Sequence, residues 1–163
     1  MSAAIDETAK PAGPVKSVLV LDTDPGVRWA LEKGLSASGY RVTVVSNVGD
    51  GIRALQDGAY DAVVMEFLPE AGLTIETLAM LGEESGGARI ICVSIESAPK
   101  TVIECMRQGA ADFLPKPFGM SEIRTALARA LAAKDEPVFM RARGSSRPAP
   151  PDDTASLLIG ISP

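Results

Sequence analysis

The stretch SVLVLDTDP, residues 17–25, predicts a buried strand that runs directly into a helix. The apolar run before Asp22 has no exposed polar position, which is typical of a strand covered on both faces. Asp24 and Pro25 suit the first turn of a helix, because an aspartate there accepts hydrogen bonds from free amides and a proline has no N–H to lose. We therefore expect Asp24 to cap the helix and Asp22 to lie at the carboxyl end of the strand.

The same alternation of an apolar run and an amphipathic segment continues outward from this stretch and occurs five times in all. The predicted strands are residues 17–22, 41–45, 62–66, 89–94 and 112–114. The predicted helices lie between Asp24 and Gly39 and at residues 48–56, 74–81, 100–108 and 121–133, the last capped by Ser121. Apolar strands separated by single helices indicate a parallel sheet with right-handed crossovers and helices on both sides. The predicted fold class is α/β, a doubly wound five-stranded parallel sheet in a single domain.

Spacing also identifies candidate core residues. Trp29, Ala30, Leu31 and Leu35 fall at helical spacing in the first predicted helix, so we expect Trp29 to be partly buried. Cys92 and Cys105 lie in apolar surroundings and are too few for a disulfide framework, so we expect buried reduced thiols.

Composition restricts the function classes. The 163 residues allow one ordinary domain, and a hydrophobic content of 46% is sufficient for a core. The sequence has no histidine, which excludes Ser-His-Asp catalysis, His-ligated zinc and a role as a histidine phosphotransfer protein. The net charge of -5 disfavours direct binding of a nucleic acid by this segment.

The two ends of the chain differ in composition from the middle. Residues 1–14 predict a disordered leader without the features of a signal peptide. No apolar run approaches the ~20 residues that span a bilayer, so we expect a cytoplasmic protein without membrane contact. Residues 134–155 predict a flexible linker, being rich in Arg, Ser and Pro. Residues 156–163 turn apolar, which fits either the start of a truncated further domain or a frayed tail.

Polar side chains stand at the carboxyl ends of the predicted strands. They are Asp22, Thr23, Glu66, Ser94 and Lys116. In an open parallel α/β sheet, ligands bind outside these ends, where the strand order reverses. Carboxylates hold a hard cation, whereas a lysine and a hydroxyl donate to phosphate oxygens. The set is therefore suited to phosphoryl chemistry.

Together with the run GAADFLPKPF, residues 109–118, this set resembles the receiver domains of bacterial two-component response regulators. The resemblance covers about residues 15–133. It implies a flavodoxin-like sheet of order 2-1-3-4-5, a signalling role without enzymatic activity, and a cis bond between Lys116 and Pro117. It also implies that Asp22 is the first acid of the pocket, Ser94 the switch hydroxyl, Phe113 the aromatic switch and Lys116 the lysine that pairs with a phosphoryl group.

Two positions depart from the pattern of that family. Thr23 stands where a second acid, a magnesium ligand, is usual, and Glu66 stands where the phospho-accepting aspartate belongs. The loop that follows is also short, because Pro69 comes one residue early and Gly72 two. The extra methylene moves the Glu66 carboxylate outward by roughly 1.5 Å, and a misplacement of that size can cost ~100-fold in a positioned reaction. We therefore expect no cofactor and no phosphorylation.

The longer side chain of Glu66 is directed toward Ser94 and Lys116. Our hypothesis is that Glu66 pairs with Lys116 and holds the domain in one signalling state without phosphate. Two other interpretations stay open: a structural ion pair with no switching role, or a weak site for a divalent ion such as Mg²⁺ between Asp22 and Glu66. Whether such a domain is locked on or silent is also open.

Receivers of this family signal by protein contact through the fourth helix, fifth strand and fifth helix, here within residues 100–108, 112–114 and 121–133. Self-pairing through that surface is the first expected partnership; a downstream output domain and a sensor kinase are further candidates. VRWALE (residues 27–32) and LLIGISP (157–163) resemble sigma-54-dependent activators of the NtrC type. That resemblance implies transcription regulation and the start of an AAA+ ATPase domain at residues 156–163. The chain has no G-x-x-x-x-G-K-[ST] loop for ATP.

Two other function classes compete with a phosphorylation-independent receiver. One is a fully competent, Mg²⁺-dependent receiver in which Glu66 or another acid is modified. The other is a flavodoxin-like ligand-binding or enzymatic domain, which is less well supported because no G-x-G-x-x-G follows the first strand.

Overall fold

The structure is a computed structural model that describes residues 13–134. The predictions of a linker and of an ATPase start lie outside the described residues, as does nearly all of the predicted leader. Contacts divide the chain into a unit over Met1–Leu131 and a second over Ala132–Pro163, of which only the first three residues are described. No helix in the described part is long and apolar enough to cross a membrane.

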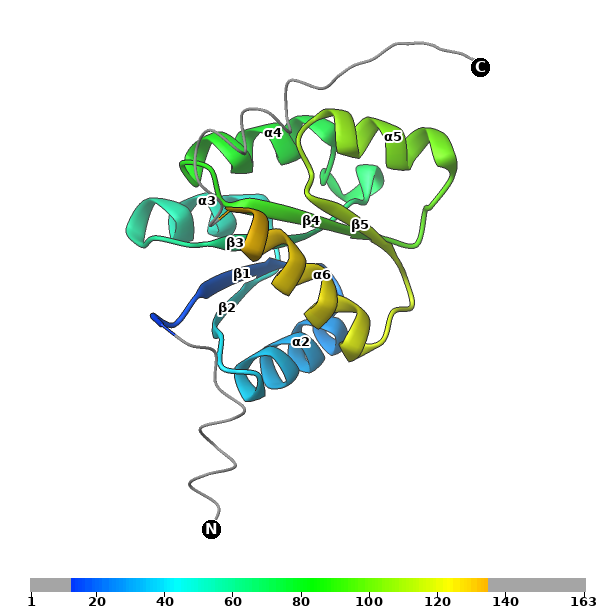
Figure 1. Cartoon of the computed structure of the whole chain (residues 1–163). Helices are drawn as coiled ribbons and strands as arrows, with labels where there is room; N and C mark the ends of the chain where they lie inside the picture. The colour runs from blue at the N-terminus through cyan, green and yellow to red at the C-terminus, as the bar shows by residue number, and fades with distance from the viewer. Residues whose placement is uncertain (1–12, 135–163) are drawn as a thin grey trace. The chain divides into compact units, whose positions relative to one another are not determined.

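The described residues form a five-stranded parallel sheet of order β2-β1-β3-β4-β5 (Figure 1). The strands are β1 (Ser17–Leu21), β2 (Arg41–Val45), β3 (Ala62–Glu66), β4 (Arg89–Ser94) and β5 (Asp112–Pro115). The helices are α2 (Pro25–Ala37), α3 (Val48–Asp57), the 3₁₀ helix η1 (Pro69–Ala71), α4 (Ile75–Glu84), α5 (Pro99–Arg107) and α6 (Met120–Lys134). The predicted fold class and strand order are confirmed.

Helices cover both faces of the sheet, with α3, α4 and α5 on one face and α2 and α6 on the other (Figure 1). Successive residues of a strand point to opposite faces. In β1, Leu19 packs toward the first group of helices, whereas Val18 packs toward Leu31 of α2 and Leu127 of α6. Both faces of the central strands are therefore buried, which explains why their sequences are apolar without alternation.

Three helix ends follow the predicted chemistry. The Asp24 carboxylate accepts hydrogen bonds from the amides of Gly26 (2.8 Å) and Val27 (3.4 Å) at the start of α2. Gly39 has φ 99° and ends that helix, and Gly109 has φ 107° after α5, a backbone conformation that glycine adopts at little cost. Asp24 is therefore a helix cap, as expected.

Two predictions at helix surfaces are wrong. Trp29 is 63% exposed, because it stands two residues before Leu31, about 200° around the helix from the buried stripe. Ser121 does not begin the last helix, since α6 already starts at Met120. The Glu122 carboxylate instead accepts from the backbone N–H of Gly119 (2.6 Å), which satisfies a free amide at the helix start.

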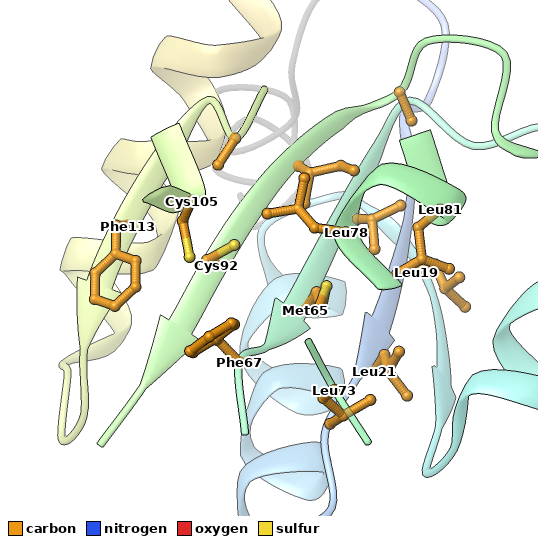
Figure 2. Close-up of a cluster of buried hydrophobic side chains, with 14 of the residues drawn as sticks. Leu19, Leu21, Met65, Phe67, Leu73, Leu78, Leu81, Cys92, Cys105 and Phe113 are labelled. Atoms are coloured by element: carbon orange, nitrogen blue, oxygen red, sulfur yellow. The ribbon is translucent and has the colours of Figure 1, made fainter. Parts of the chain in front are cut away.

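The two cysteines lie in the core, between the sheet and α5. Figure 2 shows Cys105 of α5 directed at Cys92 of β4, with Phe113 of β5 beside them. Both are free and buried, as predicted, and burial raises the pKa of each thiol. The thiols therefore stay protonated and serve as core side chains.

Candidate functional site

The sequence-predicted polar residues meet at the carboxyl edge of the sheet. Asp22 and Thr23 follow β1, Glu66 ends β3, Ser94 ends β4 and Lys116 follows β5. We call Asp22, Thr23, Glu66 and Lys116 the acid half of the pocket, because hydrogen bonds or ion pairs join all four. We call Ser94 and Phe113 the hydroxyl half.

Lys116 is the centre of the acid half. Its Nζ lies 3.0 Å from Glu66 Oε2 and 3.0 Å from Asp22 Oδ2, and it donates a hydrogen bond to Asp22 Oδ1 at 3.2 Å. The backbone N–H of Lys116 donates to Ser94 O (2.7 Å), which ties the end of β5 to the end of β4. The side chains are 11% (Lys116), 5% (Glu66) and 1% (Asp22) exposed, so the ions are largely shielded from water. The predicted pairing of Glu66 with Lys116 is confirmed.

Thr23 holds the other oxygen of Glu66. Its backbone N–H donates to Glu66 Oε1 at 2.9 Å and its hydroxyl donates to the same oxygen at 2.8 Å. Sequence reasoning treated Thr23 only as a lost metal ligand and missed this role. A signal was available, because a threonine next to a strand end offers two donors and a carboxylate at a neighbouring strand end needs them.

Asp22 is held differently from Glu66. Its Oδ1 accepts from the Asp24 amide (2.9 Å) and from Lys116, whereas Oδ2 has the ion pair with Lys116 and no hydrogen bond. The carbonyl oxygen of Asp22 accepts from Arg28 Nη1 of α2 at 2.7 Å. The buried Oδ2 of Asp22 therefore has an ion pair with Lys116 and no hydrogen bond.

The pKa values follow these contacts. Burial raises the pKa of Asp22, and its hydrogen bonds with Asp24 and Lys116 offset this only in part. Burial also acts to raise the pKa of Glu66, but the two Thr23 donors and Lys116 outweigh it, so the pKa is lowered. Burial acts to lower the pKa of Lys116, but its bonds to Glu66 and Asp22 raise it. Glu66 and Lys116 are therefore both charged at neutral pH.

The two residues of the hydroxyl half are engaged within the protein, Ser94 by hydrogen bonds and Phe113 by packing. Ser94 is fully buried; its Oγ donates to Phe67 O at 2.8 Å and accepts from the Glu96 amide at 2.9 Å. Glu66 does not bond to Ser94, contrary to the direction expected for the longer side chain; its oxygens bind Thr23 and Lys116 instead. Phe113 is buried in the core next to Cys105 (Figure 2).

The short loop after β3 is ordered by its own bonds. Leu68 and Leu73 exchange backbone hydrogen bonds of 2.8 and 3.1 Å around η1, and Gly72 adopts φ 82°. The amide of Phe67 donates to Val93 O (2.8 Å), so the chain leaves Glu66 still paired with β4. The bond between Lys116 and Pro117 is cis, as the resemblance implied.

All four carboxylate oxygens of the acid half are engaged by groups of the protein. Magnesium takes oxygen ligands in near-octahedral geometry at 2.0–2.1 Å. Three of the four carboxylate oxygens of Asp22 and Glu66 already accept hydrogen bonds, and the fourth faces the Lys116 ammonium at 3.0 Å. Among residues 13–134, no three His, Cys, Asp or Glu side chains are grouped so as to hold a metal ion.

Comparisons with known proteins agree with the fold. The family model for the response regulator receiver domain matches residues 18–128. The DNA-binding transcriptional regulator NtrC of Bradyrhizobium sp. (strain RP501 Parasponia) is 30% identical over 151 residues, which are 92% of this chain and 30% of that protein. NtrC of Rhizobium meliloti (strain 1021) is 30% identical over 116 residues, 71% of this chain and 24% of that protein. The chain thus spans less than a third of these two relatives.

A solved structure shows the same architecture. The receiver domain protein (CheY-like) from Methanospirillum hungatei JF-1 superposes with a TM-score of 0.69 over 75% of this chain and 98% of that chain, at 18% identity. At that identity the likeness concerns the fold. The family match, which covers most of the described residues, decides the assignment: this chain belongs to the response regulator receiver domain family.

Proposed function

We propose that this receiver domain signals without being phosphorylated, and that the Glu66–Lys116 ion pair holds it in one signalling state. The observation that carries the proposal is the placement of Lys116. Its ammonium lies 3.0 Å from the Glu66 carboxylate, where the family resemblance implies a partner for a phosphoryl group. An internal anion thus takes the part that a transferred phosphoryl group would play.

The state of Glu66 supports this proposal. A carboxylate that attacks phosphorus needs a free oxygen in line with the leaving group. Both Glu66 oxygens are engaged, Oε1 by the two Thr23 donors and Oε2 by Lys116. Donors that stabilise the carboxylate charge also make it a weaker nucleophile. The side chain is therefore better suited to an ion pair than to phosphoryl transfer.

In this proposal, the domain passes its signal on by contact with another protein chain, in the regulation of transcription. Ile103 and Met106 of α5 are 50% and 42% exposed, and they present apolar surface on the face through which the family resemblance implies self-pairing. A second copy of this chain is the partner we favour, and a downstream output domain would use the same face. The relatives named DNA-binding transcriptional regulator favour a cytoplasmic role in transcription regulation. In this proposal, residues 13–134 do not contact the DNA themselves.

Incubation with acetyl phosphate and Mg²⁺, followed by intact-mass measurement, tests the proposal. We expect no phosphoryl adduct on the natural protein. The double variant Thr23→Asp, Glu66→Asp restores the acids that the family pattern has at both positions, and it serves as the positive control for the reagent. A stoichiometric adduct on Glu66 of the natural protein would overturn the proposal in favour of a phospho-accepting receiver.

Self-pairing is tested separately by small-angle scattering over a range of protein concentrations. We expect a concentration-dependent dimer that Ile103→Glu weakens, because a charge on the contact face must be desolvated on association. Trp29→Glu, on the exposed side of α2, is the matched control. A strict monomer at high concentration would count against this partnership.

A further inference from the structure

We infer that Thr23 makes this pocket reject divalent cations, so that Lys116 is the cation that balances its carboxylates. The inference deepens the proposed function and rests on it, because both take the pocket to work without a phosphoryl group. It assigns the selection against divalent cations to Thr23, because Glu66 alone would not exclude them.

The carboxylate oxygens of Glu66 and Asp22 are already engaged by donors of the protein. Glu66 Oε1 accepts two hydrogen bonds from Thr23, at 2.9 and 2.8 Å, and Glu66 Oε2 accepts one from Lys116 at 3.0 Å. Asp22 Oδ1 accepts from the Asp24 amide and from Lys116. A cation at the pocket would have to break these bonds to gain carboxylate ligands, and each broken bond leaves a donor without a partner.

Nearby backbone oxygens are engaged as well. The Asp22 carbonyl accepts from Arg28 Nη1 (2.7 Å), and the Phe67 carbonyl accepts from the Ser94 hydroxyl (2.8 Å). Hard cations in proteins complete their coordination with such carbonyls or with water. Neither of these two carbonyls is therefore free to bind a cation.

Thr23 also changes the polarity of the groups that face Glu66. An acid at position 23 would contribute negative charge and ligand oxygens, whereas Thr23 directs two hydrogens at Glu66 Oε1. A divalent cation on that oxygen would face the positive ends of both donors. Thr23 thus replaces attraction for a cation by repulsion, in addition to removing a ligand.

Thr23 differs from Lys116 and Glu66 in its effect on cation binding. Lys116 cannot be the selecting residue by itself, because the family resemblance implies the lysine in pockets that also hold magnesium. Glu66 keeps a carboxylate, which is a good ligand for a hard cation. Thr23 is the position at which a carboxylate is replaced by a donor that is bound to Glu66. Thr23 and Glu66 therefore act together, since both donors of Thr23 bind the same oxygen of Glu66.

Manganese(II) alone is the probe, because it prefers oxygen ligands as magnesium does and its free ion is counted by electron paramagnetic resonance. We expect the natural protein to bind no Mn²⁺ at the pocket. Thr23→Asp should bind one ion there, with an affinity at least about tenfold above the weakest that the measurement detects. Thr23→Asn, which matches aspartate in size without the charge, should behave like the natural protein. Thr23 is exposed, so these substitutions leave the core intact.

Location is checked by paramagnetic broadening of amide signals. Bound Mn²⁺ should broaden the amides of residue 23 and Phe67, whereas the amide of Asp57, at the end of α3, reports binding to surface acids. Thr23→Glu is the second variant if Thr23→Asp does not fold. Pocket binding by the natural protein as tight as that of Thr23→Asp would overturn the inference. A folded acidic variant that binds no Mn²⁺ would also overturn it, because Glu66 or Lys116 would then be the selecting residue.

The test separates this inference from the proposed function, since it uses no phosphodonor. A phosphoryl adduct on a natural protein that binds no Mn²⁺ would contradict the proposed function only. Mn²⁺ in the pocket of a natural protein that forms no adduct would contradict the role of Thr23 only.

Discussion

The acid half and Ser94 of the hydroxyl half lie at the same edge of the sheet but are held by different forces. In the acid half, charged groups bind one another: Lys116 contacts Glu66 and Asp22 at 3.0 Å. In the hydroxyl half, Ser94 exchanges neutral hydrogen bonds with the backbone of Phe67 and Glu96. Relative to the family pattern, the first half departs at Thr23 and Glu66, whereas the resemblance matches both residues of the second.

The difference shows that a residue can match the family pattern while its side chain is bound to other groups of the protein. Ser94 matches the family position, yet its hydroxyl is committed to a carbonyl inside the protein. Thr23 and Glu66 do not match, yet together with Lys116 they complete a network in which every member has a partner. The four predictions below test whether the two halves differ in strength, in pH dependence and in tolerance of substitution.

The largest effect is expected from Lys116→Met. It leaves the Glu66 and Asp22 carboxylates buried without a cation, which should lower the free energy of unfolding by about 3–5 kcal/mol. Urea unfolding measures this, with Lys100→Met on the exposed start of α5 as the matched control. A loss under about 1 kcal/mol would mean that the acid half is no stronger than a surface ion pair.

Ser94→Ala tests the hydroxyl half. It leaves the Phe67 carbonyl and the Glu96 amide without their buried partner, so we expect a loss of about 1–3 kcal/mol in the free energy of unfolding. Ser36→Ala, on the exposed side of α2, should be within about 0.5 kcal/mol of the natural protein. The loss in Ser94→Ala should not vary with pH, because the substitution removes no charge. A strongly pH-dependent loss would contradict the view that the hydroxyl half is held by neutral hydrogen bonds and the acid half by charges.

The pH dependence of unfolding distinguishes the two acids. The pKa of Glu66 is lowered, so its contribution is fully present above its unfolded value of about 4.3 and is lost as the pH falls through the folded value. The pKa of Asp22 is raised, so its contribution has the opposite sign and favours folding as the pH falls toward about 3.9. Relative to the natural protein, Glu66→Gln should reduce the loss of stability in acid and Asp22→Asn should increase it.

Urea midpoints measured from neutral pH to about pH 3 check both variants. Glu32→Gln, on the exposed side of α2, serves as the control for a surface carboxylate. Equal acid sensitivity in Glu66→Gln and Asp22→Asn would contradict the opposite pKa shifts.

The smallest effect is expected from Thr23→Val, which keeps the shape of the side chain and removes one donor. The backbone N–H still binds Glu66 Oε1, so the loss should be about 1 kcal/mol. Thr23→Ser restores the hydroxyl and should recover most of it. A Thr23→Val protein as stable as the natural one would show that the hydroxyl adds nothing to the acid half.

Most of the fold could be predicted from the sequence, because its strands are short apolar runs that end at polar residues. The strand order rested on the family resemblance, and so did the cis bond at Pro117. The exposure of Trp29 was not predicted, since apolar character was given more weight than its position around the helix. The start of α6 was missed because Ser121 is a good cap by type, whereas the bond from Gly119 to Glu122 depends on backbone geometry.

The site could be predicted in part. Pairing of Glu66 with Lys116 followed from one extra methylene and two opposite charges. The contact between Thr23 and Glu66 did not follow, because it depends on how β1 and β3 align across the sheet and on the rotamer of a flexible carboxylate. Ser94 was expected to face Glu66; its bond to Phe67 requires the path of the chain beyond β3, which local spacing does not encode.

The most direct test of the central claim is titration of the natural protein with beryllofluoride and Mg²⁺, followed by two-dimensional ¹H–¹⁵N spectra. If the Glu66–Lys116 pair already fills the role of the phosphoryl group, the amide signals of Ser94 and Phe113 stay at their positions throughout the titration. A saturable shift of both signals would contradict the account, because it would show a pocket that still takes a phosphoryl-like ligand and switches in response.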